Sequence, residues 1–256
     1  MEFTGQIAEI QQRLAACREM AARRNAVLQE LEPRRGQRIL EVGCGAGLLL
    51  REVGLAVGPH GLAAGVDVSP DQIKAAEREC AGVPAVKPMA ADVRRLDYPE
   101  GVFDAALAVQ TLEYVEDVPG ALAELRRVLK PGGRFLCLAT NWDSAFWHGP
   151  PEALTDDIAA AWDGHASWPN LPARLPPLLA RAGFANIRWV PVPIVNPTLH
   201  ENTFAYWIAR LMAAYAVGRG VAEERARAWL AALDAAEEEG EFFFSSVPIL
   251  TTALAA

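Results

Sequence analysis

The 256-residue sequence is poor in cysteine, in histidine and in long apolar runs. Its four cysteines are scattered, without a CxxC pair or a histidine at metal-ligand spacing, so neither a disulfide framework nor a metal site is indicated. No stretch reaches the roughly 18 apolar residues that a membrane span needs. The first residues also lack the charged-then-apolar order of a signal peptide. We therefore expect a cytoplasmic protein without a membrane span.

Basic residues are in the minority, with 24 lysines and arginines against 32 aspartates and glutamates and a net charge of −8. That sign disfavours nonspecific attraction to nucleic acid or to an anionic membrane surface. We expect a small-molecule substrate as the partner and leave a homodimer open. Because 52% of the residues are hydrophobic, the chain can bury one substantial core, and we expect residues 1–256 to form a single domain with insertions.

Strands alternate with helices through the first half of the chain. Apolar runs bounded by turn residues predict five strands, at 38–42, 62–68, 83–89, 103–109 and 134–139. Helical spacing predicts the helices between them, at 48–57, 71–80 and 118–129. Such alternation predicts a parallel sheet with helices on both faces, because each right-handed crossover lays its helix against the sheet. The predicted fold class is α/β.

Other segments surround this predicted core, which spans residues 34–140. Residues 1–33 have the apolar spacing of amphipathic helices. An irregular, tryptophan-rich insertion is expected over 141–170 and a helical lid over 196–240. Between them we expect a helix at 171–182 and a strand at 187–194, and the final strand is expected within 241–256.

The first predicted strand runs into three alternate glycines, in the segment Glu41-Val42-Gly43-Cys44-Gly45-Ala46-Gly47. Glycine adopts positive φ readily and leaves bare backbone against a ligand. Asp67 ends the second strand about 20 residues later, where a carboxylate can accept hydrogen bonds from the ribose of an adenosine cofactor. A tight loop without a ligand and a solvated carboxylate are the alternatives.

Two common cofactor classes fit this turn poorly. The dinucleotide fingerprint needs glycine at the sixth position counted from Gly43, and that position is Leu48. The turn also lacks the Gly-Lys-Ser/Thr ending of a P-loop. A dinucleotide-dependent oxidoreductase is thereby disfavoured, whereas a noncatalytic protein that binds an adenosine cofactor stays open.

Five segments resemble, in order, the motifs of class I S-adenosylmethionine-dependent methyltransferases, particularly those of ubiquinone and menaquinone biosynthesis and of small natural products. They are ILEVGCGAG, GVDVSP, AADVRRLDY, FDAALAVQTLEYVED and LKPGGRFLCLA. The resemblance implies a Rossmann-like sheet of seven strands whose last strand, expected at 242–250, is antiparallel. It also implies S-adenosylmethionine as cofactor and methyl transfer to an O, N or C nucleophile of a small, aromatic or hydrophobic molecule.

The same resemblance implies the residues that hold the cofactor, namely Glu41, Gly43, Gly45, Gly47, Asp67, Val68, Asp92, Val93 and Gln110. The glycine turn would carry the methionine moiety and Asp67 the ribose hydroxyls. Val68 would cover an adenine face, Asp92 would bind the adenine amino group, and Gln110 would form the wall beside the sulfonium. A turn cap is the alternative for Asp92, and satisfaction of strand-end backbone groups is the alternative for Gln110.

Candidate catalytic residues follow the fourth and fifth strands, where loops border the ligand crevice of an open α/β sheet. His148 could act as a base because the unperturbed histidine pKa is about 6.5. Tyr114 could donate to a substrate oxygen, and Asp143 could orient a hydroxyl or amine. A surface histidine, a solvated carboxylate and simple packing are the alternatives.

Large aromatic side chains are the strongest indication of the substrate. Rigid aromatics form apolar cavities that can stack on a flat molecule. We take Trp142, Trp147 and Tyr206 as candidate substrate contacts, with ordinary packing of a core or lid as the alternative. They favour a flat or hydrophobic substrate.

Overall fold

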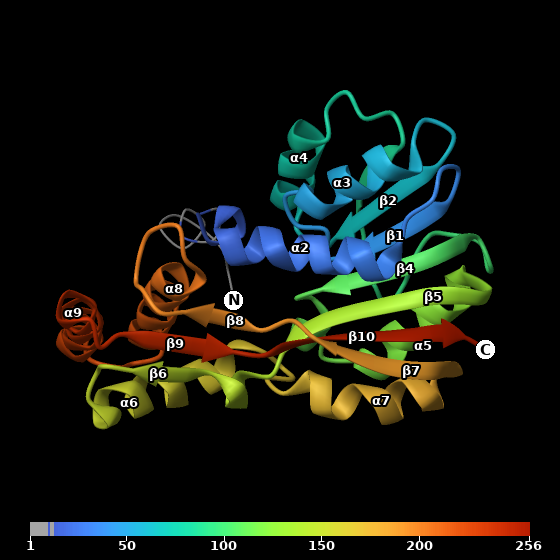
Figure 1. Ribbon diagram of the computed structural model, residues 1–256. Helices are drawn as coiled ribbons and strands as arrows, with labels where there is room; N and C mark the ends of the chain where they lie inside the picture. Colours follow the sequence, from blue (N-terminus) through green and yellow to red (C-terminus); the bar gives the residue numbers. More distant parts are fainter. Residues whose placement is uncertain (1–9, 11–12) are drawn as a thin grey trace. The chain divides into compact units, whose positions relative to one another are not determined.

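The computed structural model describes residue 10 and residues 13–256 (Figure 1). Its contacts divide the chain into two units. The helical unit comprises Met1–Asn25, Asn141–Pro169 and Val192–Pro248, and the sheet unit comprises Ala26–Thr140, Asn170–Pro191 and Ile249–Ala256. Helix α2 (Arg18–Leu31) has its first residues in the helical unit and its last residues in the sheet unit.

The sheet unit is built on seven strands in the order β3-β2-β1-β4-β5-β10-β7. Their bounds are β1 Arg38–Val42, β2 Leu62–Asp67, β3 Val86–Ala90, β4 Phe103–Val109, β5 Leu129–Thr140, β7 Phe184–Pro191 and β10 Pro248–Ala255. Strands β1 to β5 pair in parallel, and β10 pairs with β7 antiparallel. The predicted Rossmann-like α/β fold with seven strands is confirmed.

Four helices of the sheet unit cover its two faces. They are α3 (Leu48–Val57), α4 (Pro70–Glu79), α5 (Val118–Val128) and α7 (Leu171–Arg181). Figure 1 shows α3 on one face and α5 with α7 on the other. Helix α4 begins at Pro70, one residue before the predicted range of 71–80, because Ser69 Oγ accepts a hydrogen bond from Gln72 N and Pro70 suits the first helical turn. These crossovers bring the carboxyl ends of β1, β2 and β4 to one edge of the sheet.

The helical unit packs α6 (Glu152–Trp162), α8 (Phe204–Gly218) and α9 (Glu223–Glu239) against one another. It also contains a small antiparallel sheet in the order β6-β9-β8. Its strands are β6 Phe146–His148, β8 Ile194–Asn196 and β9 Phe243–Ser246. The unit has its own hydrophobic core, in which the side chains of Trp229 and Phe244 are fully buried.

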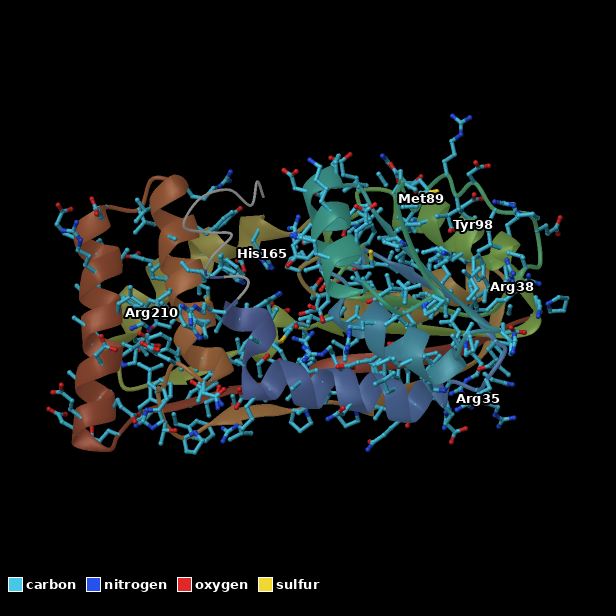
Figure 2. All side chains as sticks on the ribbon, turned by 90° about the horizontal axis from the view of Figure 1, so that it is seen from above. Arg35, Arg38, Met89, Tyr98, His165 and Arg210 are labelled. Carbon is cyan, nitrogen blue, oxygen red and sulfur yellow. The ribbon has the colours of Figure 1, made fainter. Side chains whose placement is uncertain are left out.

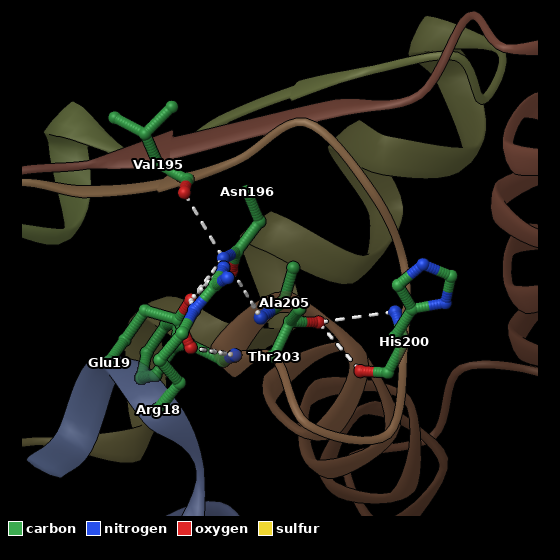
Figure 3. Close-up of polar contacts among 8 residues, drawn as sticks. Arg18, Glu19, Val195, Asn196, His200, Thr203 and Ala205 are labelled. Atoms are coloured by element: carbon green, nitrogen blue, oxygen red, sulfur yellow. Dashed lines mark hydrogen bonds and ion pairs between the residues drawn. The ribbon is translucent and has the colours of Figure 1, made fainter.

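Helix α8 begins at a buried polar network (Figure 3). Glu19 of α2 accepts a hydrogen bond from Phe204 N at 2.9 Å and another from Asn196 Nδ2 at 2.7 Å. Asn196 in turn accepts a bond from Ala205 N at 2.9 Å through its Oδ1. The first amides of a helix lack intrahelical partners, and these two side chains supply acceptors for them, Glu19 from a distant part of the sequence and Asn196 from the segment just before α8.

Two sequence-based expectations were wrong in detail. The segment 141–170 is not irregular, because it forms β6 and helix α6, whose residues Ile158 and Trp162 are buried. The expected strand at 242–250 is two strands, β9 and β10, in different sheets. Strand pairing is interrupted at Val247, between β9 and β10, where the amide donates to Ser144 Oγ at 3.1 Å instead of to a neighbouring strand.

The strand expected at 187–194 is likewise divided. It forms the end of β7 and the start of β8, with Pro193 between them. Proline has no amide hydrogen to donate to a ladder, so it favours a break between strands.

Candidate functional site

Three glycines turn the chain from β1 into α3, with φ angles of 67° at Gly43, 50° at Gly45 and 86° at Gly47. A Cβ at Gly43 would lie 2.2 Å from Thr111 Oγ1, and one at Gly47 would lie 2.9 Å from the Cβ of Ala76. Among the described residues, a Cβ at Gly45 would meet no atom closer than 3.9 Å. Gly43 and Gly47 therefore permit close packing, whereas Gly45 leaves bare backbone open to a ligand.

The carboxylate of Asp67 is in direct contact with this turn. Its Oδ2 accepts a hydrogen bond from Gly45 N at 3.0 Å, and its Oδ1 accepts one from Ser69 N at 2.9 Å. A carboxylate has about four acceptor positions, so two remain for the hydroxyl groups of a ribose. The glycine turn and the acidic residue predicted to share one cofactor thus lie at one place.

The residues expected around an adenine ring follow β2 and β3. The side chain of Val68 is 72% exposed, which is unusual for valine and leaves an apolar surface beside Asp67. The backbone of Ala91 donates to Asp67 O at 3.0 Å, which joins the segment after β3 to the end of β2. Val93 is buried beyond it. An apolar surface next to a ribose-binding carboxylate fits an adenosine.

Asp92 makes the local contacts that the sequence left open as its alternative role. Its carboxylate accepts hydrogen bonds from Arg94 N at 2.9 Å and from the Arg94 guanidinium at 2.6 Å. The hydrogen bonds from the Arg94 side chain lower the pKa of Asp92. Asp92 is therefore an ionised acceptor at the end of β3, and binding of an adenine amino group stays a prediction.

Glu41 is a buried acid beneath the glycine turn. It is 4% exposed, and its Oε2 makes no hydrogen bond with any residue in the described part of the chain. Burial, with smaller contributions from the negative charges of Glu52 and Asp67, raises its pKa to about 8. A cationic group of a bound ligand would stabilise the ionised form of this buried carboxyl, which has other acids near it. The site therefore fits a cofactor that carries positive charge.

Gln110 directly follows β4 and has a left-handed backbone conformation, with φ of 51°. Its amide is bound by Thr140 and by Glu113, both 1% exposed. The next residue, Thr111, lies against Gly43. Sequence reasoning missed the contributions of Thr111 and Thr140, although a hydroxyl residue directly after a buried strand is a signal that could have pointed to them.

The candidate catalytic residues fall in different units. Tyr114 is 42% exposed and ends the 3-10 helix η1 (Leu112–Tyr114) of the sheet unit. Asp143, in the 3-10 helix η2 (Trp142–Ser144), and His148, in β6, belong to the helical unit. His148 is exposed, and its ring stacks at 6.5 Å on that of Phe146. The roles given to these three residues stay predictions.

Two of the aromatic candidates pack inside the helical unit. Trp147 lies 5.2 Å from the ring of Trp229 and 4.3 Å from that of Phe244, measured between ring centroids. Trp142 meets Trp162 edge-on at 5.3 Å. Both therefore make the packing contacts that the sequence left open as their alternative, and contact with a substrate stays a prediction for them.

Two further groups of the helical unit are labelled in Figure 2. Arg210 of α8 places its guanidinium 3.3 Å from the ring centroid of Tyr206, the third substrate candidate. His165, which the sequence did not single out as a site residue, stacks on Trp162 at 4.0 Å. Burial lowers the pKa of His165 to about 4, so this histidine is neutral at pH 7.

Residues 10 and 13–256 contain no group of three or more histidine, cysteine or acidic side chains that could hold a metal ion. Within the same residues no helix is both long and apolar enough to cross a bilayer.

Comparison with known families agrees with this geometry. Residues 40–137 match the family described as "Methyltransferase domain". Residues 40–137 therefore form a methyltransferase domain. The matched range starts within β1 and ends within β5, so it contains the glycine turn, Asp67 and Gln110.

Curated relatives match this chain over part of their length. A ubiquinone/menaquinone biosynthesis C-methyltransferase, UbiE, of Caulobacter sp. strain K31 is 34% identical over 43% of this chain and 39% of its own. A demethylmenaquinone methyltransferase of Symbiobacterium thermophilum is 35% identical over 32% of this chain and 34% of its own. The chain thus spans little more than a third of the length of these relatives.

Solved structures share the fold over most of the chain. The YcgJ protein of Bacillus subtilis has a TM-score of 0.60 at 21% identity and covers 90% of this chain and 97% of its own. A geranyl diphosphate C-methyltransferase of Streptomyces coelicolor has a TM-score of 0.56 at 16% identity, covering 92% and 78%. The cyclase SpnF also has a TM-score of 0.56, at 24% identity, covering 91% and 80%. These likenesses concern the fold, which hosts more than one reaction.

Proposed function

We propose that this protein transfers the methyl group of S-adenosylmethionine to an O, N or C nucleophile of a small molecule, aromatic or hydrophobic, of the quinone-like or secondary-metabolite kind. One observation carries the proposal, namely the hydrogen bond from Gly45 N to Asp67. It joins the backbone suited to the methionine part and the carboxylate suited to the ribose in one site. The names of the curated relatives, which are quinone methyltransferases, support the substrate class.

The cofactor, when bound, supplies a methyl group on an electrophilic sulfonium. Residues of this chain have to hold it, orient the nucleophile and exclude water. Asp67 and the open backbone at Gly45 would bind the nucleoside and amino-acid parts, Val68 would cover the adenine, and Glu41 would receive positive charge.

A dedicated base is needed only for some acceptors. A neutral amine can attack first and lose its proton afterwards, whereas a carbon or hydroxyl nucleophile benefits from a base. Tyr114, Asp143 and His148 remain our proposed candidates for proton transfer or orientation. Trp142, Trp147 and Tyr206 remain our proposed substrate contacts. A cytoplasmic location and a homodimer remain predictions.

The decisive experiment measures binding of S-adenosylhomocysteine by calorimetry. Asp67→Ala should weaken binding by about 1 to 3 kcal/mol, the range for removing one partner of a buried hydrogen bond. Asp71→Ala is the matched control, because the Asp71 side chain is 91% exposed in the first turn of α4, and its affinity should stay at the wild-type value. Thermal unfolding of both variants establishes that they are folded.

Two results would reject the proposal. One is a wild-type protein that binds NADH but not S-adenosylhomocysteine. The other is an unchanged affinity in folded Asp67→Ala. The acceptor class is tested separately, by transfer of a labelled methyl group to hydroxylated quinones and other aromatic molecules, with protein and nucleic acid as acceptors expected to stay unlabelled.

A further inference from the structure

The side-chain amide of Gln110 is held at both of its ends. Thr140 Oγ1 donates to Gln110 Oε1 at 2.9 Å, and Gln110 Nε2 donates to Glu113 Oε1 at 2.5 Å. Glu113 and Thr140 come from different elements, the 3-10 helix η1 after β4 and the end of β5. Both are 1% exposed, so water does not compete strongly for these bonds.

The carboxylate of Glu113 decides which way this amide faces. A hydroxyl such as that of Thr140 can donate or accept, and would tolerate either orientation of the amide. Oε1 of Glu113 accepts from Nε2, so the NH2 group points toward Glu113 and the amide oxygen points toward Thr140. The two contacts take one N–H and one lone pair of the amide, and the directions of the other N–H and lone pair are thereby set.

The backbone of Gln110 also indicates a constrained position. Its φ of 51° lies in the left-handed region, which is unfavourable for a residue with a side chain and persists where the surroundings hold it. Gln110 N donates to Leu138 O of β5 at 2.8 Å. Since Thr111 lies against Gly43, this strained turn borders the glycine turn directly.

We propose that Glu113 and Thr140 are positioning residues that act through Gln110, by fixing its amide in one orientation on the wall of the cofactor site. The inference rests on the proposed function, because it assumes that this wall faces the bound cofactor. It assigns to Glu113 no proton transfer and no contact with the cofactor. What Glu113 contributes is an acceptor that selects one of the two amide orientations.

The test combines a signal from Gln110 itself with cofactor affinity. In protein labelled with 15N-glutamine, the Gln110 side-chain signals, assigned by their loss in Gln110→Ala, should form one sharp NH2 pair. Glu113→Gln has the same shape but can donate or accept, so these signals should broaden or double. Affinity for S-adenosylhomocysteine should fall about tenfold, the equivalent of one buried hydrogen bond.

Matched variants separate positioning from a general loss of structure. Thr140→Val should behave like Glu113→Gln, and Thr140→Ser, which restores the hydroxyl, should return the affinity to within about twofold of wild type. Glu116→Gln changes an exposed acid of the same segment and should leave the Gln110 side-chain signals and the affinity for S-adenosylhomocysteine unchanged. A purely structural role would lower the melting temperature without changing the affinity of the folded protein. If Glu113→Gln does not fold, the comparison of Thr140→Val with Thr140→Ser decides the question.

Failure of this inference differs from failure of the proposed function. Wild-type affinity in both Glu113→Gln and Thr140→Val, with unchanged amide signals, would overturn the positioning role while the cofactor site stands. An effect of Thr140→Val alone would overturn the role of Glu113. A wild-type protein that does not bind S-adenosylhomocysteine, although its Gln110 signals respond to Glu113→Gln, would reject the cofactor site.

Discussion

Replacing Glu41 with glutamine should change how the stability of the protein depends on pH. Glu41 is buried, and burial together with the charges of Glu52 and Asp67 raises its pKa from 4.5 to about 8. In the unfolded chain this carboxyl has its ordinary pKa. Between pH 4.5 and 8 the folded protein therefore keeps a proton that the unfolded chain has lost.

The sign and size of the effect follow from this difference. Below pH 4.5 both states hold the proton and the folded state keeps its full stability. As the pH rises above that value, the unfolded state gains by ionising, and the free energy of unfolding falls by about 1.4 kcal/mol per pH unit. The loss should reach about 3 kcal/mol near pH 7, and it should level off above pH 8.

Urea unfolding between pH 5 and pH 8 measures this loss. Glu41→Gln carries no proton to lose, so its unfolding free energy should fall less steeply than that of wild type over this range. Glu77→Gln removes an exposed acid from α4 and should leave the wild-type slope unchanged. Parallel curves for wild type and Glu41→Gln would refute a raised pKa at this position.

Three shorter predictions concern the glycine turn, the start of α8 and a thiol. Gly43→Ala should lower the melting temperature and weaken S-adenosylhomocysteine binding more than Gly36→Ala does. Both glycines have positive φ, but only a Cβ at Gly43 would clash with Thr111. Equal effects of the two substitutions would contradict the contact between Gly43 and Thr111. Asn196→Ala should destabilise the protein by about 2 kcal/mol in urea unfolding, since Ala205 N loses its buried acceptor; unchanged stability would show that the network in Figure 3 contributes little. Burial raises the pKa of the Cys80 thiol to about 11. At pH 8 this thiol should therefore be alkylated on the order of a hundredfold more slowly than free cysteine, as measured by mass spectrometry of the native protein. Rapid labelling would contradict its burial.

Local sequence was sufficient for the parts of this protein whose structure depends on neighbouring residues. The alternation of apolar strands with helices predicted the parallel core, because the period of the side chains and the handedness of crossovers leave few other arrangements. The glycines after β1 and the acid at the end of β2 could also be assigned to one site from the sequence. The carboxyl ends of adjacent parallel strands meet at one edge of a sheet, and the structure has Gly45 N bound to Asp67 there.

Tertiary structure decided what depends on residues far apart in the chain. Nothing local in 242–250 shows that β9 and β10 pair in different sheets, since the partner strands and the Ser144 hydroxyl that binds Val247 lie outside the segment. The raised pKa of Glu41 follows from burial that only the folded chain provides. Likewise, the orientation of the Gln110 amide depends on Glu113 and on Thr140 of β5 together. Periodicity and turn chemistry are properties of adjacent residues, whereas desolvation and the choice of hydrogen-bond partners arise only when distant segments pack.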